Sequence, residues 1–237
     1  MRSARAAPHL RVLWADATAI DGAAIDALVT DEDRERVTAL ATPRRRKEYL
    51  SGRALLRRAL ERHTGRAACS HRLATTPTGK PVCVDGPALS LSHDDGLVVC
   101  AVSNGSAVGI DVQSRSRGRH TTEIADYHFS AAERAWLQRA PNADAFYWLW
   151  VLKEAYLKRL GTGLAGGLAQ LECRVEPPLI DATAPTLAAL ALCSLGTAFV
   201  GVAADSGDLD DFACERWTGE HVEASRLEPI AYGTTLV

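Results

Sequence analysis

The sequence carries little net charge and lacks the paired cysteines that mark a zinc finger or a redox motif. It has 27 Lys or Arg against 29 Asp or Glu, so no global field attracts nucleic acid or a membrane surface. Its six cysteines are spread without a C-x-x-C pair and without histidines at metal-finger spacing. We interpret them as small thiols in a reducing compartment and therefore expect a cytoplasmic protein.

Hydrophobic segments suited to secretion or membrane insertion are also missing. Arg2 and Arg5 near the N-terminus are not followed by a long apolar run, so we expect no signal peptide. The uncharged run from Thr186 to Ala204 has the length of a membrane span. Polar and glycine residues interrupt it, and Leu195-Gly196-Thr197 at its centre is typical of a turn between two strands. We expect no membrane segment here.

The apolar content, 47% of residues, is enough for the core of one large or two small domains. Periodicity and turn residues predict, in order, a strand over Arg11–Ala15, a helical segment over Ile20–Leu40, a helix from Pro43 to Gly65, a hairpin of Ala88–Ser92 with Leu97–Ser103, a strand over Val108–Gln113, and a buried helix within Ala145–Gly163. The uncharged run described above supplies two more strands.

The same order of elements recurs after roughly one hundred residues. A helix followed by a strand pair occurs first near 44–62 and 89–102, and again near 145–160 and 187–203. This recurrence predicts an α+β fold of two similar lobes, 1–105 and 106–237. Clefts between lobes are favoured ligand sites.

Basic residues cluster in the first of these lobes. Between Arg34 and Arg66 there are eleven Arg or Lys against three Glu. Such an excess can focus an anionic small molecule such as a polyphosphate, or it can be a solvated helix face. A nucleic-acid-binding module is disfavoured because the basic run lacks interleaved exposed aromatics.

Two carboxylates stand out in the second half. Asp111 shares one face of its predicted strand with Gln113, while the alternate residues are apolar, so Asp111 must point out of the core. Glu154 lies one turn before Lys158 on a helix that is otherwise apolar. This pair is either a simple ion pair or part of a site. Together, Asp111 and Glu154 have the oxygen ligands that suit Mg²⁺.

Two other motifs do not carry the activity that their residues first suggest. Gly161-Thr-Gly163-Leu-Ala-Gly166 matches a dinucleotide-binding pattern, but it closes a helix instead of opening one, so we interpret Gly161 as a helix cap. Ser92-His93-Asp94 cannot form a hydrolase triad from adjacent hairpin positions. A phosphate contact there is more consistent with the sequence. Ser130 and Glu133 predict a helix capping box.

Several motifs, taken in order, resemble one enzyme family. They are Gly79-Lys80-Pro81, Leu91-Ser92-His93, Val108-Gly-Ile-Asp111-Val-Gln113, Phe129-Ser-x-x-Glu133, Trp150-x-x-Lys153-Glu154-Ala155-x-x-Lys158 and Gly161-x-Gly163-Leu164. Over about residues 44 to 165, the sequence resembles the Sfp-type 4′-phosphopantetheinyl transferases. The resemblance implies a monomer of two similar α+β lobes related by pseudo-twofold symmetry, with coenzyme A in the cleft between them.

The implied reaction moves the phosphopantetheine arm of coenzyme A to a serine of an apo acyl or peptidyl carrier protein and releases 3′,5′-ADP. By resemblance, Asp111 and Glu154 would hold Mg²⁺, or Mn²⁺, and Glu154 or a water would take the serine proton. Lys158 would protonate the leaving phosphate oxygen. The residues implied to bind coenzyme A are Arg46, Arg53, Lys80, Ser92, His93 and Lys153.

Gln113 departs from the family pattern, because many relatives have an acidic third metal ligand at this position. We expect two direct carboxylate ligands, with Gln113 as a neutral ligand or a holder of bound water. By resemblance, the carrier protein would contact about Ser114 to Leu137. Arg115, Arg117 and Arg119 in this segment suit an acidic partner, or they belong to a solvated loop. The alternative is a non-catalytic coenzyme A- or nucleotide-binding regulator with the same fold.

Overall fold

The computed structural model describes residues 8–105, 107–115, 121–140, 142–205, 207, 209 and 212–237. The helices are α1 Gly22–Asp26, α2 Asp31–Thr38, α3 Pro43–Thr64, α4 Thr121–His128, α5 Ala131–Arg139 and α6 Ala145–Leu160. The strands are β1 Leu10–Asp16, β2 Leu73–Thr75, β3 Pro81–Cys83, β4 Ala88–Asp94, β5 Leu97–Ser103, β6 Val108–Ser114, β7 Glu172–Glu176, β8 Leu179–Thr183, β9 Ala189–Leu195, β10 Ala198–Ala204, β11 Ala213–Trp217, β12 Val222–Ala224 and β13 Glu228–Leu236.

The two long helices begin and end where the sequence predicts. Thr42 caps α3 by accepting a hydrogen bond from the backbone N–H of Arg45 at 3.3 Å, and Pro43 follows at the first helical position. Gly65 ends α3 with a left-handed φ of 72°, and Gly161 ends α6 with a φ of 75°. The interpretation of Gly161 as a helix stop is confirmed.

The single helical segment expected over residues 20–40 is wrong. The chain forms two short helices instead, α1 and α2, separated at 27–30. Thr30 starts the second helix, because its side chain and that of Asp33 form a reciprocal capping box. The Thr-x-x-Asp pattern is present in the sequence and predicts this break.

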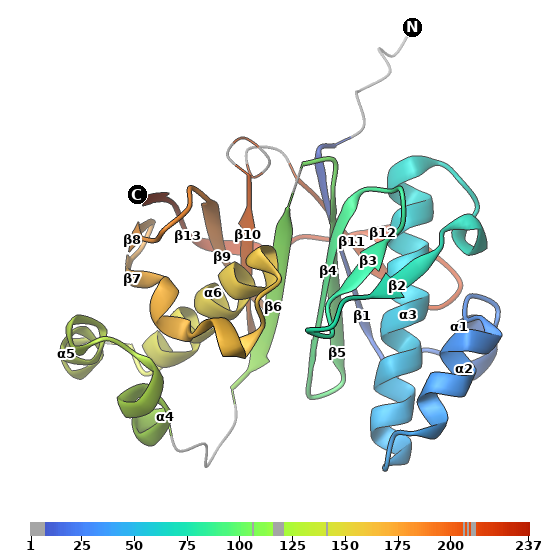
Figure 1. Ribbon diagram of the computed structural model, residues 1–237, viewed down its shortest axis with the longest axis horizontal. Helices are drawn as coiled ribbons and strands as arrows, with labels where there is room; N and C mark the ends of the chain where they lie inside the picture. The colour runs from blue at the N-terminus through green and yellow to red at the C-terminus, as the bar shows by residue number, and fades with distance from the viewer. Residues whose placement is uncertain are drawn as a thin grey trace, which may run out of the picture.

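Two sheets build the molecule (Figure 1). The first has the order β12-β11-β1-β5-β4, the second has the order β6-β10-β9-β13-β8-β7, and β2 with β3 forms a separate pair. The uncharged run from Thr186 to Ala204 supplies the β9–β10 hairpin, as expected. Within the described part of the chain, no helix is long and apolar enough to cross a membrane.

Three apolar clusters arrange these elements in layers. One lies between α3 and the first sheet, and another lies between α6 and the second sheet. The third joins the remaining faces of the two sheets, with Val12 and Val99 from the first sheet and Ile110 and Val200 from the second. The order is therefore helix, sheet, sheet, helix, and it confirms an α+β fold.

The pseudo-twofold relation and the boundary near residue 105 stay predictions. The strand pairing bears on that boundary, because β11 pairs in parallel with β1. The chain thus returns to the first sheet after residue 212, and β13 then pairs with β9 in the second sheet. The segment 213–224 belongs to the first sheet, although it lies far from it in sequence.

Gly109 on β6 allows α6 to pack against the second sheet at backbone distance. A Cβ at this position would lie 1.8 Å from the Ala155 carbonyl oxygen. We expect Gly109→Ala to lower the free energy of unfolding by about 3 kcal/mol, because backbone atoms must move to make room. Urea unfolding measures this loss. Gly22→Ala is the control, since nothing lies within 4 Å of that added methyl group, and equal stability of the two variants would contradict the prediction.

Candidate active site

The edge strands β4 and β6 come from different sheets, and polar side chains join them. Ser90, Ser92 and Asp94 alternate along β4 and therefore share one face of the strand. We call these three residues the β4 polar row. The Ser90 hydroxyl oxygen accepts a hydrogen bond from the backbone N–H of Ile110 at 3.1 Å. The other two members of the row contact side chains of β6.

Asp111 lies at the centre of the polar contact between β4 and β6. Its Oδ1 accepts a hydrogen bond from the Ser92 hydroxyl at 2.6 Å and one from the Lys158 ammonium group at 2.5 Å. Lys158 also donates to the Ser92 hydroxyl oxygen at 2.8 Å. β4, β6 and α6 therefore each contribute one side chain to a single cluster. The Asp111 side chain is only 7% exposed, and that of Lys158 is 26% exposed.

Glu154 lies on the same face of α6, one turn before Lys158. It lines a pocket of about 330 Å³ between α6, the Thr78–Pro81 turn and β4. Burial raises the pKa of Glu154, and the charge of Asp111 raises it further, while Lys158 acts in the opposite direction. The two carboxylates are thus close enough to influence each other.

Lys80 closes the pocket at the C-terminal end of α6. Its ammonium group donates to the carbonyl oxygen of Lys158 at 2.5 Å and to that of Val108 at 3.2 Å. Burial lowers the pKa of Lys80 to about 8. A cation at this position satisfies terminal carbonyl groups of the helix and holds the backbone that carries Lys158.

Gln113 lies two residues after Asp111 on the same face of β6. Its side-chain nitrogen donates to Asp94 at 2.7 Å. The sequence did not predict this contact, since Asp94 was considered there only as a member of the rejected Ser92-His93-Asp94 triad. The alternation Ser90-x-Ser92-x-Asp94 was the available signal, because it places three polar side chains on one face of a strand.

Comparison with known proteins identifies the family. Residues 107–218 match the model of the 4′-phosphopantetheinyl transferase superfamily, and residues 32–103 match the model of the 4′-phosphopantetheinyl transferase N-terminal domain. The chain is 32% identical over 180 residues to the 4′-phosphopantetheinyl transferase pptA of Paxillus involutus, covering 64% of this chain and 68% of that protein. The chain belongs to the 4′-phosphopantetheinyl transferase superfamily.

Bacterial members of this superfamily are also similar to the chain. It is 28% identical over 176 residues to the 4′-phosphopantetheinyl transferase HetI of a Nostoc species, covering 70% of this chain and 74% of HetI. It is 30% identical over 155 residues to a 4′-phosphopantetheinyl transferase of Bacillus subtilis, covering 63% of this chain and 68% of that protein.

One lysine of the motif on α6 lies away from the pocket that Glu154 lines. Lys153 is fully buried on a different face of α6, where its ammonium group is 2.7 Å from the Glu133 carboxylate and donates to the Leu168 carbonyl oxygen at 2.9 Å. The assignment of Lys153 to coenzyme A binding is therefore wrong in this fold. Glu133 forms the expected capping box with Ser130 and also accepts a hydrogen bond from the backbone N–H of Cys173.

Arg53 is also placed elsewhere than the sequence analysis expected. It and Arg57 are buried against the two carboxylate oxygens of Asp33, at 2.6 Å each. Burial would raise the pKa of Asp33, but the hydrogen bond from the Thr30 backbone and the two guanidinium groups outweigh it, so the pKa is lowered. Arg53 therefore holds α2 against α3, and its assignment to coenzyme A binding is wrong in this structure.

Arg46 and His93 remain accessible near the first turns of α3. Arg46 is exposed and donates to the Leu40 carbonyl oxygen at 2.9 Å. The His93 side chain is 49% exposed, with its Nδ1 at 3.8 Å from Glu48 of α3. Many other basic residues of this region are paired with acids, among them Arg34, Arg36, Arg44, Arg58 and Arg62.

Proposed function

We propose that the chain transfers the 4′-phosphopantetheine arm of coenzyme A to a serine of an apo carrier protein and releases 3′,5′-ADP. Superfamily membership supports the reaction class. The observation that carries the assignment to this site is the contact of Ser92, Asp111 and Lys158 beside Glu154. It gathers two acids and a lysine at one junction between the sheets, and phosphoryl transfer needs positioning and charge neutralisation above all.

The donor chemistry of the site fits Mg²⁺ or Mn²⁺. Asp111 and Glu154 offer carboxylate oxygens, and the charge of Asp111 helps to raise the pKa of Glu154. Hard oxygens are the ligands that Mg²⁺ prefers. Among the described residues, no three His, Cys, Asp or Glu side chains gather as a metal site. The proposed ligands are the two carboxylates, assisted by the Gln113 amide. A bound metal would neutralise charge on the pyrophosphate.

The residues then divide the chemistry as follows. Glu154, whose pKa is raised, accepts the proton of the carrier serine. The hydroxyl oxygen of that serine attacks the phosphorus that bears pantetheine. The bond between that phosphorus and the bridging oxygen breaks. Lys158 donates a proton to the departing oxygen, and Ser92 holds Asp111 in place from the opposite sheet.

Four residues remain as proposed contacts for the phosphates of coenzyme A. Lys80 lines the pocket beside Glu154, and Ser92 contacts the pocket residue Lys158. His93 is exposed on β4, and Arg46 is exposed in the first turn of α3. The proposed set is thus smaller than the one expected from sequence, because Arg53 and Lys153 are committed to buried acids.

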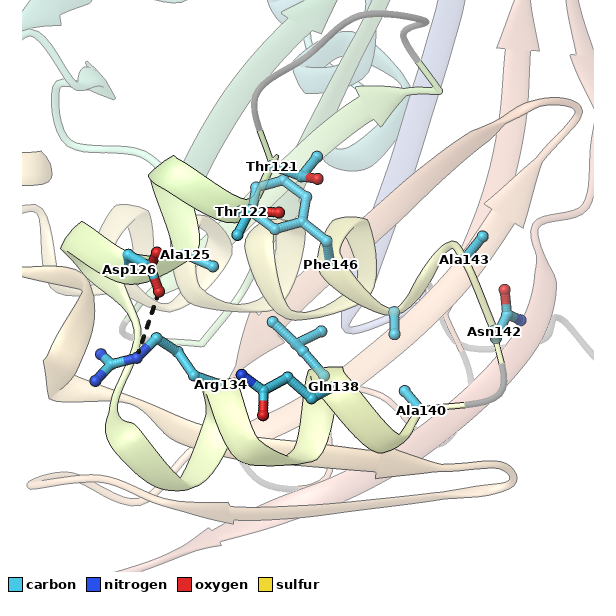
Figure 2. A pocket seen from close by; sticks show the side chains of 12 residues that line it. Thr121, Thr122, Ala125, Asp126, Arg134, Gln138, Ala140, Asn142, Ala143 and Phe146 are labelled. Carbon is cyan, nitrogen blue, oxygen red and sulfur yellow. Dashed lines mark ion pairs between the residues drawn. The ribbon is translucent and has the colours of Figure 1, made fainter.

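We propose that the carrier protein docks on the region around α4 and α5, and that the enzyme acts as a cytoplasmic monomer. A pocket of about 490 Å³ lies there, between α4, α5 and the start of α6 (Figure 2). Phe146 forms part of its wall, and Asp126 and Arg134 pair across its rim at 3.7 Å. Arg115 pairs with Asp144, while Arg117 and Arg119 lie outside the described residues.

Intact-mass analysis tests the proposal. An apo carrier protein incubated with the chain, coenzyme A and Mg²⁺ should gain the mass of one phosphopantetheinyl group. A carrier with its acceptor serine replaced by alanine is the control and should gain nothing. Binding of coenzyme A without any mass gain would instead indicate a non-catalytic regulator.

A further inference from the structure

Asp94, the last residue of β4, bridges to the end of β6. Its Oδ2 accepts a hydrogen bond from the Gln113 side-chain nitrogen at 2.7 Å and another from the Ser114 backbone N–H at 2.7 Å. β4 and β6 belong to different sheets, so these bonds do not belong to a strand ladder. They join the two halves of the molecule next to Asp111.

The chemistry of Asp94 determines the orientation of the Gln113 amide. An ionised carboxylate only accepts hydrogen bonds, so the NH₂ group of Gln113 must face it. The Oε1 atom then lies on the opposite edge of the amide plane, and no described residue donates a hydrogen bond to it. Gln113 is only 6% exposed, so the packing around it also restricts its rotation.

The same arrangement disfavours an acid at position 113. A glutamate there has no proton to donate at neutral pH, and its carboxylate would meet that of Asp94 at hydrogen-bond distance. Two like charges in such a position repel each other. The amide of Gln113 therefore matches Asp94 in a way that a carboxylate cannot.

We propose that Asp94 is a positioning residue of the active site, which fixes the Gln113 amide and requires a neutral side chain at position 113. By anchoring the Gln113 nitrogen, it turns the neutral amide oxygen away from Asp94, on the strand face that Gln113 shares with Asp111. The part of this inference that concerns the metal rests on the proposed function, whereas the pairing of Asp94 with Gln113 does not.

A double-mutant cycle tests the pairing. Gln113→Glu alone should lower the melting temperature by about 5 °C, because it buries two facing carboxylates. Adding Asp94→Asn should restore part of that loss, because the neutral asparagine no longer places a second negative charge against the carboxylate at position 113, and its amide nitrogen can donate to that carboxylate in place of the bond from Ser114. Asp95→Asn, at the exposed neighbouring acid, is the control and should restore nothing. Additive effects of Asp94→Asn and Gln113→Glu would overturn the inference.

Measurements of metal binding distinguish a positioning role of Asp94 from a purely structural one. We measure the Mn²⁺ dissociation constant by calorimetry and the KM for Mg²⁺ in the transfer assay. The double variant should bind Mn²⁺ about tenfold more tightly than Gln113→Glu alone. The carboxylate introduced at position 113 no longer faces the charged Asp94 and is free to turn toward the metal. Asp94→Asn alone should raise the KM for Mg²⁺ with little change in kcat. Unchanged metal parameters in all variants would overturn the positioning role.

The failure of the proposed function would look different. In that case the wild-type chain would neither bind Mn²⁺ nor modify a carrier protein. The effects of Gln113→Glu and Asp94→Asn on the melting temperature would still be non-additive in the double variant. That result supports the pairing of Asp94 with Gln113 and counts against the transferase assignment alone.

Discussion

Replacing Glu154 by glutamine is expected to reduce phosphopantetheine transfer by about 10³-fold or more, because the variant loses a proton acceptor and one charge of the metal site. The fold should remain intact. Burial and the neighbouring Asp111 raise the pKa of Glu154, so its ionised form destabilises the folded state at neutral pH. A neutral glutamine removes that cost, and the metal-free variant should melt at the same or a higher temperature than wild type.

The rate is measured by single-turnover mass analysis, and stability is measured by thermal unfolding. Glu172→Gln on β7 is the matched control, since Glu172 is exposed and should tolerate the same change with full activity. Near-normal transfer by Glu154→Gln would refute the site assignment. A large fall in melting temperature would refute the pKa argument, because it would mean that the Glu154 carboxylate stabilises the fold.

Replacing Lys153 by methionine is expected to lower the free energy of unfolding by about 3 to 5 kcal/mol. Lys153 and Glu133 are both fully buried and paired, so the substitution leaves Glu133 as an unpaired charge in the core. A protein of this size loses roughly 2 to 4 °C of melting temperature per kcal/mol, so the shift should reach about 10 °C. The double variant Glu133→Gln with Lys153→Met should recover part of the loss.

Lys158→Met is the control on the same helix. Its side chain is partly exposed, and Ser92 still donates to Asp111 when the ammonium group is gone, so the stability loss should be smaller. Transfer should nevertheless fall steeply in Lys158→Met. In Lys153→Met, measured at a temperature where the protein is folded, the KM for coenzyme A should stay near the wild-type value. A raised KM with unchanged stability would restore Lys153 as a cofactor ligand.

The long elements could be predicted because their signals are local. Thr42, Pro43 and Gly65 mark the ends of α3 by rules that act within one helical turn. The turn at Asp95 and Gly96, both with positive φ, marks the β4–β5 hairpin in the same way. The alternation along β6 likewise indicates which of its residues face the core.

The three-dimensional neighbours of each charge could not be predicted in this way. Lys153 and Lys158 lie on one helix and in one motif, yet the first pairs with Glu133 and the second with Asp111. Their angular separation around α6 sends them to different sides, and only the packed structure shows which side faces the other sheet. The pairing of Arg53 with Asp33 has the same origin, because it depends on how α2 lies on α3.

By itself, the sequence determined the order of the long helices and the strand hairpins, the family, and the carboxylates Asp111 and Glu154, because motif and periodicity are properties of neighbouring residues. The tertiary structure alone decided that β11 and β12 return to the first sheet, and that the β4 polar row meets β6. These contacts join residues far apart in the chain. Their partners are selected by the burial of two sheets against each other, which leaves no local mark in the sequence.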